Sequence, residues 1–492
     1  MSSLKEKTAH GLYWGTILQG GQQVLNLLFG ICLARLLSPD DYGMVGMLTL
    51  FSAIATSLQE SGFMAALANR PNPTARDYNS VFWTNILIGL SCYVVLFFCA
   101  PLIAFFFKTP ELTALARYQF LGFLFASFNT AQSAVLFKNL MVRQRAISVI
   151  TAMSVSGIVG VAMAWLGFAY WGLATQNLVY ILTCAAMYWH FSPWRPTFRV
   201  DFGPVREMFG FSSRLLLTNV FQQINNYFFN VLLGHLQTRQ MVGYFSQANK
   251  WSTMGYSFVD GILSNVAQPV LASVAGERER QQTVFRKMLR FTAFISFPAL
   301  FGLALIAREL ILITITDKWA FSIPILQILC LWGAFFPIGR LYTNLIISRG
   351  NSRIYMWGTM ALGLLQIAVV ALSLRFGILV SIAVYALVNI LWLGVWQYVA
   401  GRMIGLRLWH ALADIVPFAA ISALVMGLTW YATRSIDNIY LLMFAKILLA
   451  AVLYATLMLV ARVRIFAESV DFLKQKFGLG RKASADSSST PD

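Results

Sequence analysis

Amide side chains recur at the same spacing in two stretches of this chain that lie 200 positions apart. The first set is Gln19, Gln22, Gln23 and Asn26, and the second is Asn219, Gln222, Gln223 and Asn226. At about 100° per residue, each set falls on one face of a helix. Amides donate and accept hydrogen bonds, so each face could bind a polar solute or a neighbouring helix. Both interpretations stay open, and recurrence in both halves favours a shared cavity.

Charged residues inside apolar segments are the second group that could carry chemistry. The deep set has four cations and one acid: Arg214, Lys250, Arg340 and Lys446, with Asp260. Lys250 is the strongest candidate because it lies about 15 Å from the start of its helix. An ion pair of Asp260 with Lys250 or Arg214 explains these residues as well as a cavity does. The excess of positive charge nevertheless predicts a basic cavity for an anionic group, and phosphate suits Arg and Lys.

The composition places these side chains in a membrane. Hydrophobic residues make up 58% of the 492 residues and charged residues 11%, whereas a soluble domain has roughly 25% charged residues. A membrane helix needs about 20 apolar residues, and we find about fourteen such runs. We therefore predict an all-α polytopic membrane protein. The net charge of +18 does not indicate nucleic acid, because most of the cations lie in loops where membrane insertion explains them.

The distribution of charge also predicts the topology. Lys and Arg are concentrated in the alternate loops that share a side with the N-terminal segment, so both termini are expected to be cytoplasmic. The first and seventh helices then leave the cytoplasm in the same direction, which predicts two parallel six-helix repeats. The expected domains are a first lobe (1–191), a cytoplasmic linker (192–206), a second lobe (207–400), helices thirteen and fourteen (401–466) and a disordered tail (467–492).

Signals for enzyme chemistry are lacking. The five cysteines fall inside predicted spans without CxxC spacing, and the four histidines are scattered in loops or at helix ends. We therefore expect no metal, no cofactor and no catalytic residues. The predicted outer loops have only a few residues, whereas a membrane enzyme such as an oligosaccharide polymerase or ligase needs a larger loop to bind its acceptor.

Four segments carry a resemblance to a known family: SLKEKTAHGLYWG, LARLLSPDDYGMVGM, FPALFGLALIARELILI and DKWAFSIPILQILCLWG. Together with the length and helix number, they resemble the Wzx-type bacterial polysaccharide flippases of the colanic-acid type, in the multidrug/oligosaccharidyl-lipid/polysaccharide superfamily. The resemblance covers nearly the whole chain. It implies a V-shaped bundle in the bacterial inner membrane. It also implies that an undecaprenyl-pyrophosphate-linked oligosaccharide moves from the inner to the outer leaflet by alternating access, coupled to an ion gradient.

The resemblance assigns no individual residue, so the site candidates follow from depth and sign. Lys250, Arg214 and Arg340 are expected to neutralise the pyrophosphate in a cavity between helices one, two, seven and eight. The amides expected to bind sugar hydroxyls are Gln22, Gln23, Asn26, Gln222, Gln223, Asn225 and Asn226. Asp260 and Glu60 are the acids available for ion coupling. The expected partners are the lipid-linked oligosaccharide and membrane lipid, a polymerase or glycosyltransferase would fit as a protein partner, and the chain itself is expected to be a monomer.

Three alternatives remain open at this point. A multidrug antiporter of the same superfamily would export cationic amphiphiles, which calls for acids and aromatic residues in the cavity rather than cations. An oligosaccharide polymerase or ligase is the enzyme alternative. A non-transporting membrane partner protein is the third, although polar faces in both halves of the chain argue against it.

Overall fold

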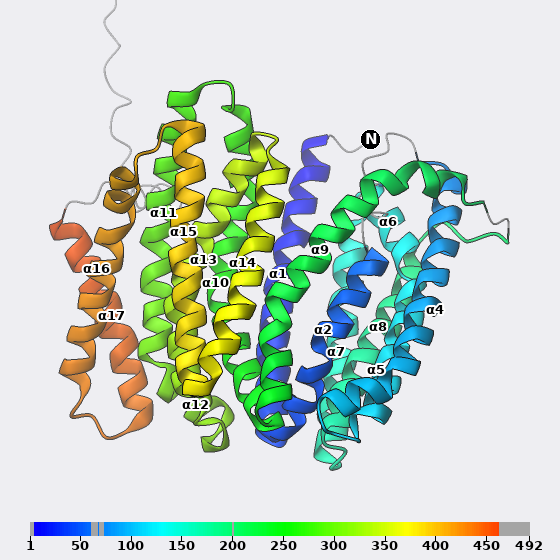
Figure 1. The fold of residues 1–492 in the computed structure, drawn as a ribbon, viewed down its shortest axis with the longest axis horizontal. Coiled ribbons are helices and arrows are strands. Elements are labelled where there is room, and N and C mark those ends of the chain that lie inside the picture. The colour runs from blue at the N-terminus through cyan, green and yellow to red at the C-terminus, as the bar shows by residue number, and fades with distance from the viewer. Residues whose placement is uncertain (1–3, 61–66, 68–72, 199–200, 462–492) are drawn as a thin grey trace, which may run out of the picture. The chain divides into compact units, whose positions relative to one another are not determined.

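The computed structural model describes residues 4–60, 67, 73–198 and 201–461 (Figure 1). These residues form helices joined by short connections, and none of them lies in a β-strand. The helices are α1 (Leu4–Leu36), α2 (Pro39–Glu60), α4 (Ala75–Phe106), α5 (Leu112–Ser127), α6 (Thr130–Lys138), α7 (Val142–Trp165), α8 (Tyr170–Phe191), α9 (Gly203–Leu236), α10 (Arg239–Ser273), α11 (Arg278–Leu305), α12 (Ala307–Ile315), α13 (Ser322–Ser348), α14 (Ser352–Ser373), α15 (Ile378–Ile404), α16 (Leu408–Thr433) and α17 (Ile439–Val460), with 3-10 turns η1 (Asp317–Trp319) and η2 (Leu374–Phe376).

Most of these helices have the length and composition of membrane spans. Ten described helices qualify alone, and α5 with α6 make an eleventh if this pair, bent by 42°, is one span. The helices α8, α9 and α10 have 22, 34 and 35 residues, which is also long enough to cross a bilayer. These three helices are not among the ten that qualify by composition. For α9 and α10 the reason is that they carry many of the predicted amides and charges. The all-α polytopic membrane fold is therefore confirmed.

The chain divides into two compact units. The first contains residues up to 254, together with 311–326 and 353–388, and the second contains 255–310, 327–352 and the residues from 389 onward. Within the first unit, α7 packs along α8, α4 along α5 and α1 along α7 (Figure 1). Within the second unit, α11 packs against α16, and α16 against α17.

The repeat is visible in the ends of the helices. The first helix α1 ends at Leu36 and α9 ends at Leu236, while α2 begins at Pro39 and α10 begins at Arg239. A hydroxyl side chain lies just before α2 and another just before α10. Ser38 and Thr238 each accept a hydrogen bond from a backbone N–H of the first turn of the helix that follows, at 3.3 and 3.4 Å. The offset of 200 positions thus relates the paired helices residue by residue.

Two glycines related by this offset lie where α2 and α10 cross. A Cβ on Gly43 would lie 1.9 Å from the carbonyl oxygen of Arg239, and a Cβ on Gly243 would lie 1.9 Å from the carbonyl oxygen of Pro39. The two contacts exchange when the numbers shift by 200, as expected for a local pseudo-two-fold axis. Only glycine allows backbones to approach this closely. The crossing, which we call the glycine crossing, is flanked by an ion pair of Asp40 with Arg239, 2.8 Å between Oδ1 and Nε.

The predicted linker is docked against α4 through its described residues. The backbone N–H of Thr197 donates to Asn79 Oδ1 at 2.9 Å, and Trp83 Nε1 donates to the Thr197 carbonyl oxygen at 2.8 Å. The Gly203 backbone N–H and the Arg76 guanidinium hold the pKa of the Asp201 carboxyl below its usual value. These contacts tie the start of α9 to the first lobe.

A buried carboxylate joins two helices of the second unit. Asp414 of α16 is buried and receives hydrogen bonds from Arg286 of α11 at 2.6 and 3.0 Å, while Arg290 Nε lies 3.5 Å from it. A bidentate Arg–carboxylate pair fixes orientation as well as distance. The charge of Asp414 is therefore compensated where it lies.

Candidate cavity for an anionic substrate

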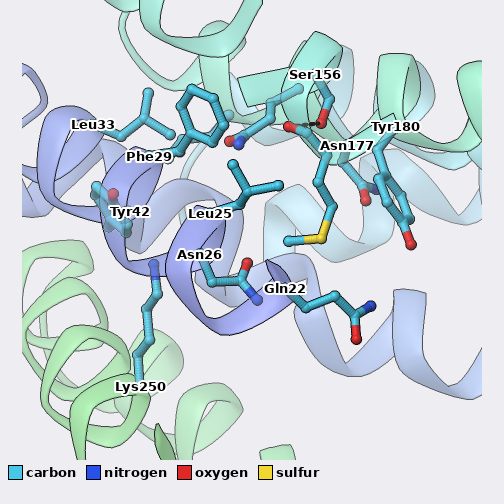
Figure 2. Close-up of a pocket in the computed structure, with 14 residues that line it drawn as sticks. Gln22, Leu25, Asn26, Phe29, Leu33, Tyr42, Ser156, Asn177, Tyr180 and Lys250 are labelled. Atoms are coloured by element: carbon cyan, nitrogen blue, oxygen red, sulfur yellow. Dashed lines mark hydrogen bonds between the residues drawn. The ribbon is translucent and has the colours of Figure 1, made fainter. Parts of the chain in front are cut away.

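A cavity of about 380 Å³ lies in the first unit, between α1, α7 and α8, with single residues of α2 and α10 completing the wall (Figure 2). Its wall is partly apolar and partly polar. Apolar residues and amides alternate along α1, and the hydroxyl groups come from other helices. The polar lining residues are Gln22, Asn26, Tyr42, Ser156, Gln176, Asn177, Tyr180 and Lys250. A cavity of this size and composition can bind a small polar group.

The cation of the cavity comes from α10. Figure 2 shows the Lys250 side chain extending toward α1, and a Cβ on Gly30 would lie 2.6 Å from its Nζ. Gly30 therefore leaves the space that the ammonium group occupies. Among the described side chains, Lys250 has no carboxylate within ion-pair distance. An ammonium group in this position needs an anion or water, because removal of a charge from water is costly.

The α8 part of the lining was not predicted from the sequence. Gln176, Asn177 and Tyr180 lie on α8 and Ser156 on α7. Gln176 is positioned by the close approach of α7 to α8, since a Cβ on Gly160 of α7 would lie 2.9 Å from Gln176 Cβ. The signal was present as the polar triplet TQN inside an apolar run. The triplet has no polar amide counterpart 200 positions later, so it does not belong to the pattern common to both repeats.

The structure brings three of the predicted residues together, namely Gln22, Asn26 and Lys250. Gln23 is exposed on α1 and does not belong to the lining. Gln222, Gln223, Asn225 and Asn226 on α9 do not belong to it either. The Asn225 side-chain amide instead donates to the Thr359 carbonyl oxygen of α14 at 3.0 Å. At Asn225 the geometry thus matches the interpretation as an interhelical hydrogen bond.

The remaining predicted residues lie elsewhere. Arg340 belongs to the second unit, where its Nε lies 3.9 Å from Asp260 Oδ2. Arg214 and Glu60 are in α9 and α2, but their side chains lie outside the described residues. The structure therefore offers Lys250 as the cation for this cavity, with the side chain of Arg214 left open.

The charge balance inferred from the sequence changes in one respect. Lys446 was counted as an uncompensated deep cation, yet its Nζ lies 2.8 Å from Glu309 Oε1. Glu309, which follows Arg308 in the segment FPALFGLALIARELILI, is not among the deep acids selected from the sequence. With Lys446 and Arg340 both paired, Lys250 is the member of the deep set without an ion pair in the described part of the chain.

Comparison with known proteins places the chain in a family. A family model described as "Polysaccharide biosynthesis protein" matches residues 32–324. The chain belongs to this polysaccharide biosynthesis protein family. The match covers the whole cavity except its first wall residues, Gln22 to Gly30, and the glycine crossing lies inside it as well.

Relatives of the chain agree with the resemblance. The lipopolysaccharide biosynthesis protein WzxC of Escherichia coli (strain K12) is 23% identical over 71% of each chain. The succinoglycan biosynthesis transport protein ExoT of Rhizobium meliloti (strain 1021) is 22% identical over 94% of this chain and 95% of its own length. The predicted relationship to polysaccharide flippases is confirmed.

Solved structures agree on the fold. The lipid II flippase MurJ in an inward closed conformation has a TM-score of 0.75 at 15% identity, covering 95% of this chain and 99% of its own. An inward-facing multidrug resistance transporter of the MATE family has a TM-score of 0.62 at 18% identity, covering 77% of this chain and 95% of its own. Both show the same helical fold for this multi-pass membrane protein.

Proposed function

We propose that this protein moves an undecaprenyl-pyrophosphate-linked oligosaccharide from the cytoplasmic to the periplasmic leaflet of a bacterial inner membrane by alternating access. The observation that carries the proposal is the Lys250 ammonium group, which lies at a polar cavity without a carboxylate partner among the described side chains. An anion supplied by the substrate would compensate this charge. The names of the relatives, which belong to polysaccharide and lipopolysaccharide synthesis, support the same substrate class.

The cavity suits the polar end of such a lipid. Lys250 would bind the pyrophosphate, while Gln22 and Asn26 of α1 and the amides of α8 would donate to and accept from sugar hydroxyls. Its volume of about 380 Å³ is at the small end of ligand pockets, which typically have roughly 300 to 1,000 Å³. The cavity therefore fits the pyrophosphate and the first sugar rather than a whole repeat unit, and the polyprenyl chain would stay in the bilayer.

The remaining expectations become part of the proposal. Asp260 and Glu60 are retained as the candidate ion-coupling acids, with Arg340 acting on Asp260 rather than on substrate. The two six-helix lobes, with the linker 192–206 between them and α16 and α17 outside the repeat, are the bodies that alternating access would move. A polymerase or glycosyltransferase would supply or consume the substrate.

Leaflet transfer of a fluorescent polyprenyl-pyrophosphate oligosaccharide in proteoliposomes tests this function. We expect transfer with the intact protein and none in protein-free vesicles. Cationic dyes loaded into the same vesicles test the multidrug antiporter, and the chain length of the recovered sugar tests a polymerase. Dye export without lipid transfer, or a lengthened oligosaccharide, would refute the flippase assignment.

Neighbouring amides on α1 provide a matched pair of variants. Gln22 lines the cavity and Gln23 does not. We expect Gln22→Ala to reduce the transfer rate roughly threefold to tenfold, because one neutral hydrogen bond contributes about 0.5–1.5 kcal/mol. Gln23→Ala should leave the rate unchanged. Equal rates for the two variants would show that this face of α1 does not contact substrate.

The glycine beside Lys250 offers a test that keeps the lysine in place. A Cβ on Gly30 would occupy space 2.6 Å from Lys250 Nζ, and the neighbour is the end of a flexible side chain. Gly30→Ala should therefore fold normally but displace the ammonium group and slow transfer. Gly20→Ala on the same helix, where nothing lies within 4 Å of the added Cβ, is the control and should transfer normally.

A further inference from the structure

The junction between α11 and α12 in the second unit is an interrupted helix. The first ends at Leu305 and the second begins at Ala307. The last carbonyl groups of a helix carry partial negative charge, and the first N–H groups carry partial positive charge. The interruption therefore places a partial negative charge at Leu305 next to the partial positive start of α12.

A cation and an anion occupy this junction. Lys446 of α17 places its Nζ 2.8 Å from Glu309 Oε1 and 3.2 Å from the Leu305 carbonyl oxygen. Glu309 lies in the first turn of α12, so each charge matches the helix end beside it. The exposed fraction of the side chain is 8% for Lys446 and 2% for Glu309. Lys446 also lies inside a helix that is apolar enough to cross a membrane, where an ionisable residue calls for an explanation.

The Glu309 carboxylate has a second oxygen that does not contact Lys446. Its second oxygen, Glu309 Oε2, is buried and has no hydrogen-bond partner among the described residues. In membrane transporters, carbonyl groups at the C-terminal end of an interrupted helix coordinate small monovalent cations, and here the Glu309 carboxylate adds a charged oxygen beside such a carbonyl group. The ammonium group is such a cation, held on a four-carbon tether.

We infer that the α11–α12 junction is a monovalent cation site whose occupant is the ammonium group of Lys446. Removal of that group exposes the site to a free cation of the same class, either a primary ammonium ion or an alkali ion. The site is separate from the cavity and does not depend on what the protein transports. An ordinary structural ion pair differs in one respect, because the loss of its lysine would not create a response to small cations.

Lys446→Ala tests the site by chemical rescue. The change removes the three outer methylene groups and the ammonium group, which together correspond to n-propylammonium. In purified protein with tetramethylammonium chloride as the only salt, Tm should fall by several degrees, because Glu309 becomes an uncompensated buried charge. Replacing that salt by n-propylammonium chloride at the same ionic strength should restore most of the loss with a saturable dependence, and sodium should restore part of it.

Two further variants identify what binds. Glu309→Gln combined with Lys446→Ala removes the carboxylate charge and should show no response to n-propylammonium. Lys446→Met fills the volume of the side chain and should also show none. An unresponsive Lys446→Ala, or an equal response of the Glu309→Gln/Lys446→Ala protein, would overturn the inference.

If Lys446→Ala does not accumulate well enough to be purified, the amount of each variant in the membrane provides a second measurement. The Glu309→Gln/Lys446→Met protein carries no charge at the junction and should then accumulate near the level of the unchanged protein. Supplementing the cells with n-propylammonium should raise the level of Lys446→Ala alone. If the uncharged pair accumulates no better than Lys446→Ala, the junction does not act as a site for charge.

Discussion

Replacement of Lys250 by methionine lowers leaflet transfer of the lipid-linked oligosaccharide roughly tenfold or more while the protein stays in the membrane at its normal level. A hydrogen bond to a charged group contributes about 1.5–3 kcal/mol, which corresponds to roughly ten- to hundred-fold in a binding constant. The fold should tolerate the change, because among the described side chains Lys250 has no ion-pair partner that would be left unpaired. Methionine keeps an unbranched side chain of similar length.

Transfer rates at equal amounts of reconstituted protein measure this effect. Lys287→Met is the matched control, since it removes the same charge from an exposed position on α11 outside the cavity lining. The control should transfer at the normal rate, which separates the role of this ammonium group from the general effect of net charge. Normal transfer by Lys250→Met would show that the Lys250 ammonium group has no role in transfer. In that case Arg214 would be the next candidate.

Substitution of alanine at Gly43 or Gly243 is expected to have the largest effect on folding. Each added Cβ would lie 1.9 Å from a backbone carbonyl oxygen of the opposite helix, and a carbonyl group cannot rotate away as a side chain can. The helices α2 and α10 would have to separate, at a cost of about 3 kcal/mol or more. We expect little folded protein from either variant, measured as the monodisperse fraction after detergent extraction.

The pseudo-two-fold relation sharpens this prediction. Because the contacts at Gly43 and Gly243 are equivalent by the repeat, the two alanine variants should lose folded protein to a similar extent. Gly261→Ala, on α10 but with nothing within 4 Å of the added Cβ, should accumulate normally. A stable Gly43→Ala protein would contradict the close contact at the crossing.

The sequence predicted the helices well because their determinants are local. Apolar runs define the spans, and the offset of 200 positions seen in the sequence recurs in the structure, where α1 and α9 end at Leu36 and Leu236. The crossing itself was not predictable. Gly43 and Gly243 lie 200 positions apart, but which backbone approaches a glycine depends on how helices distant in sequence pack.

The candidate site was predictable only in part, for a related reason. Amides common to both repeats led to Gln22 and Asn26, which line the cavity, and equally to Gln222 and Asn226, which do not belong to its lining. Gln176 and Asn177 have no amide counterpart 200 positions later, so the recurrence that led to Gln22 and Asn26 does not select them. Depth within a helix identified Lys250, but the partner of Lys446 became apparent only once the α11–α12 interruption was known.

Binding of the pyrophosphate group at Lys250 is the central claim, and it can be measured without transport. We would titrate purified protein with a short-chain polyprenyl pyrophosphate and with the matching polyprenyl alcohol, and repeat both titrations with Lys250→Met. The unchanged protein should bind the pyrophosphate roughly tenfold or more tightly than the alcohol, and the variant should bind the two equally. The same preference for pyrophosphate in both proteins would contradict a role of Lys250 in binding the anion.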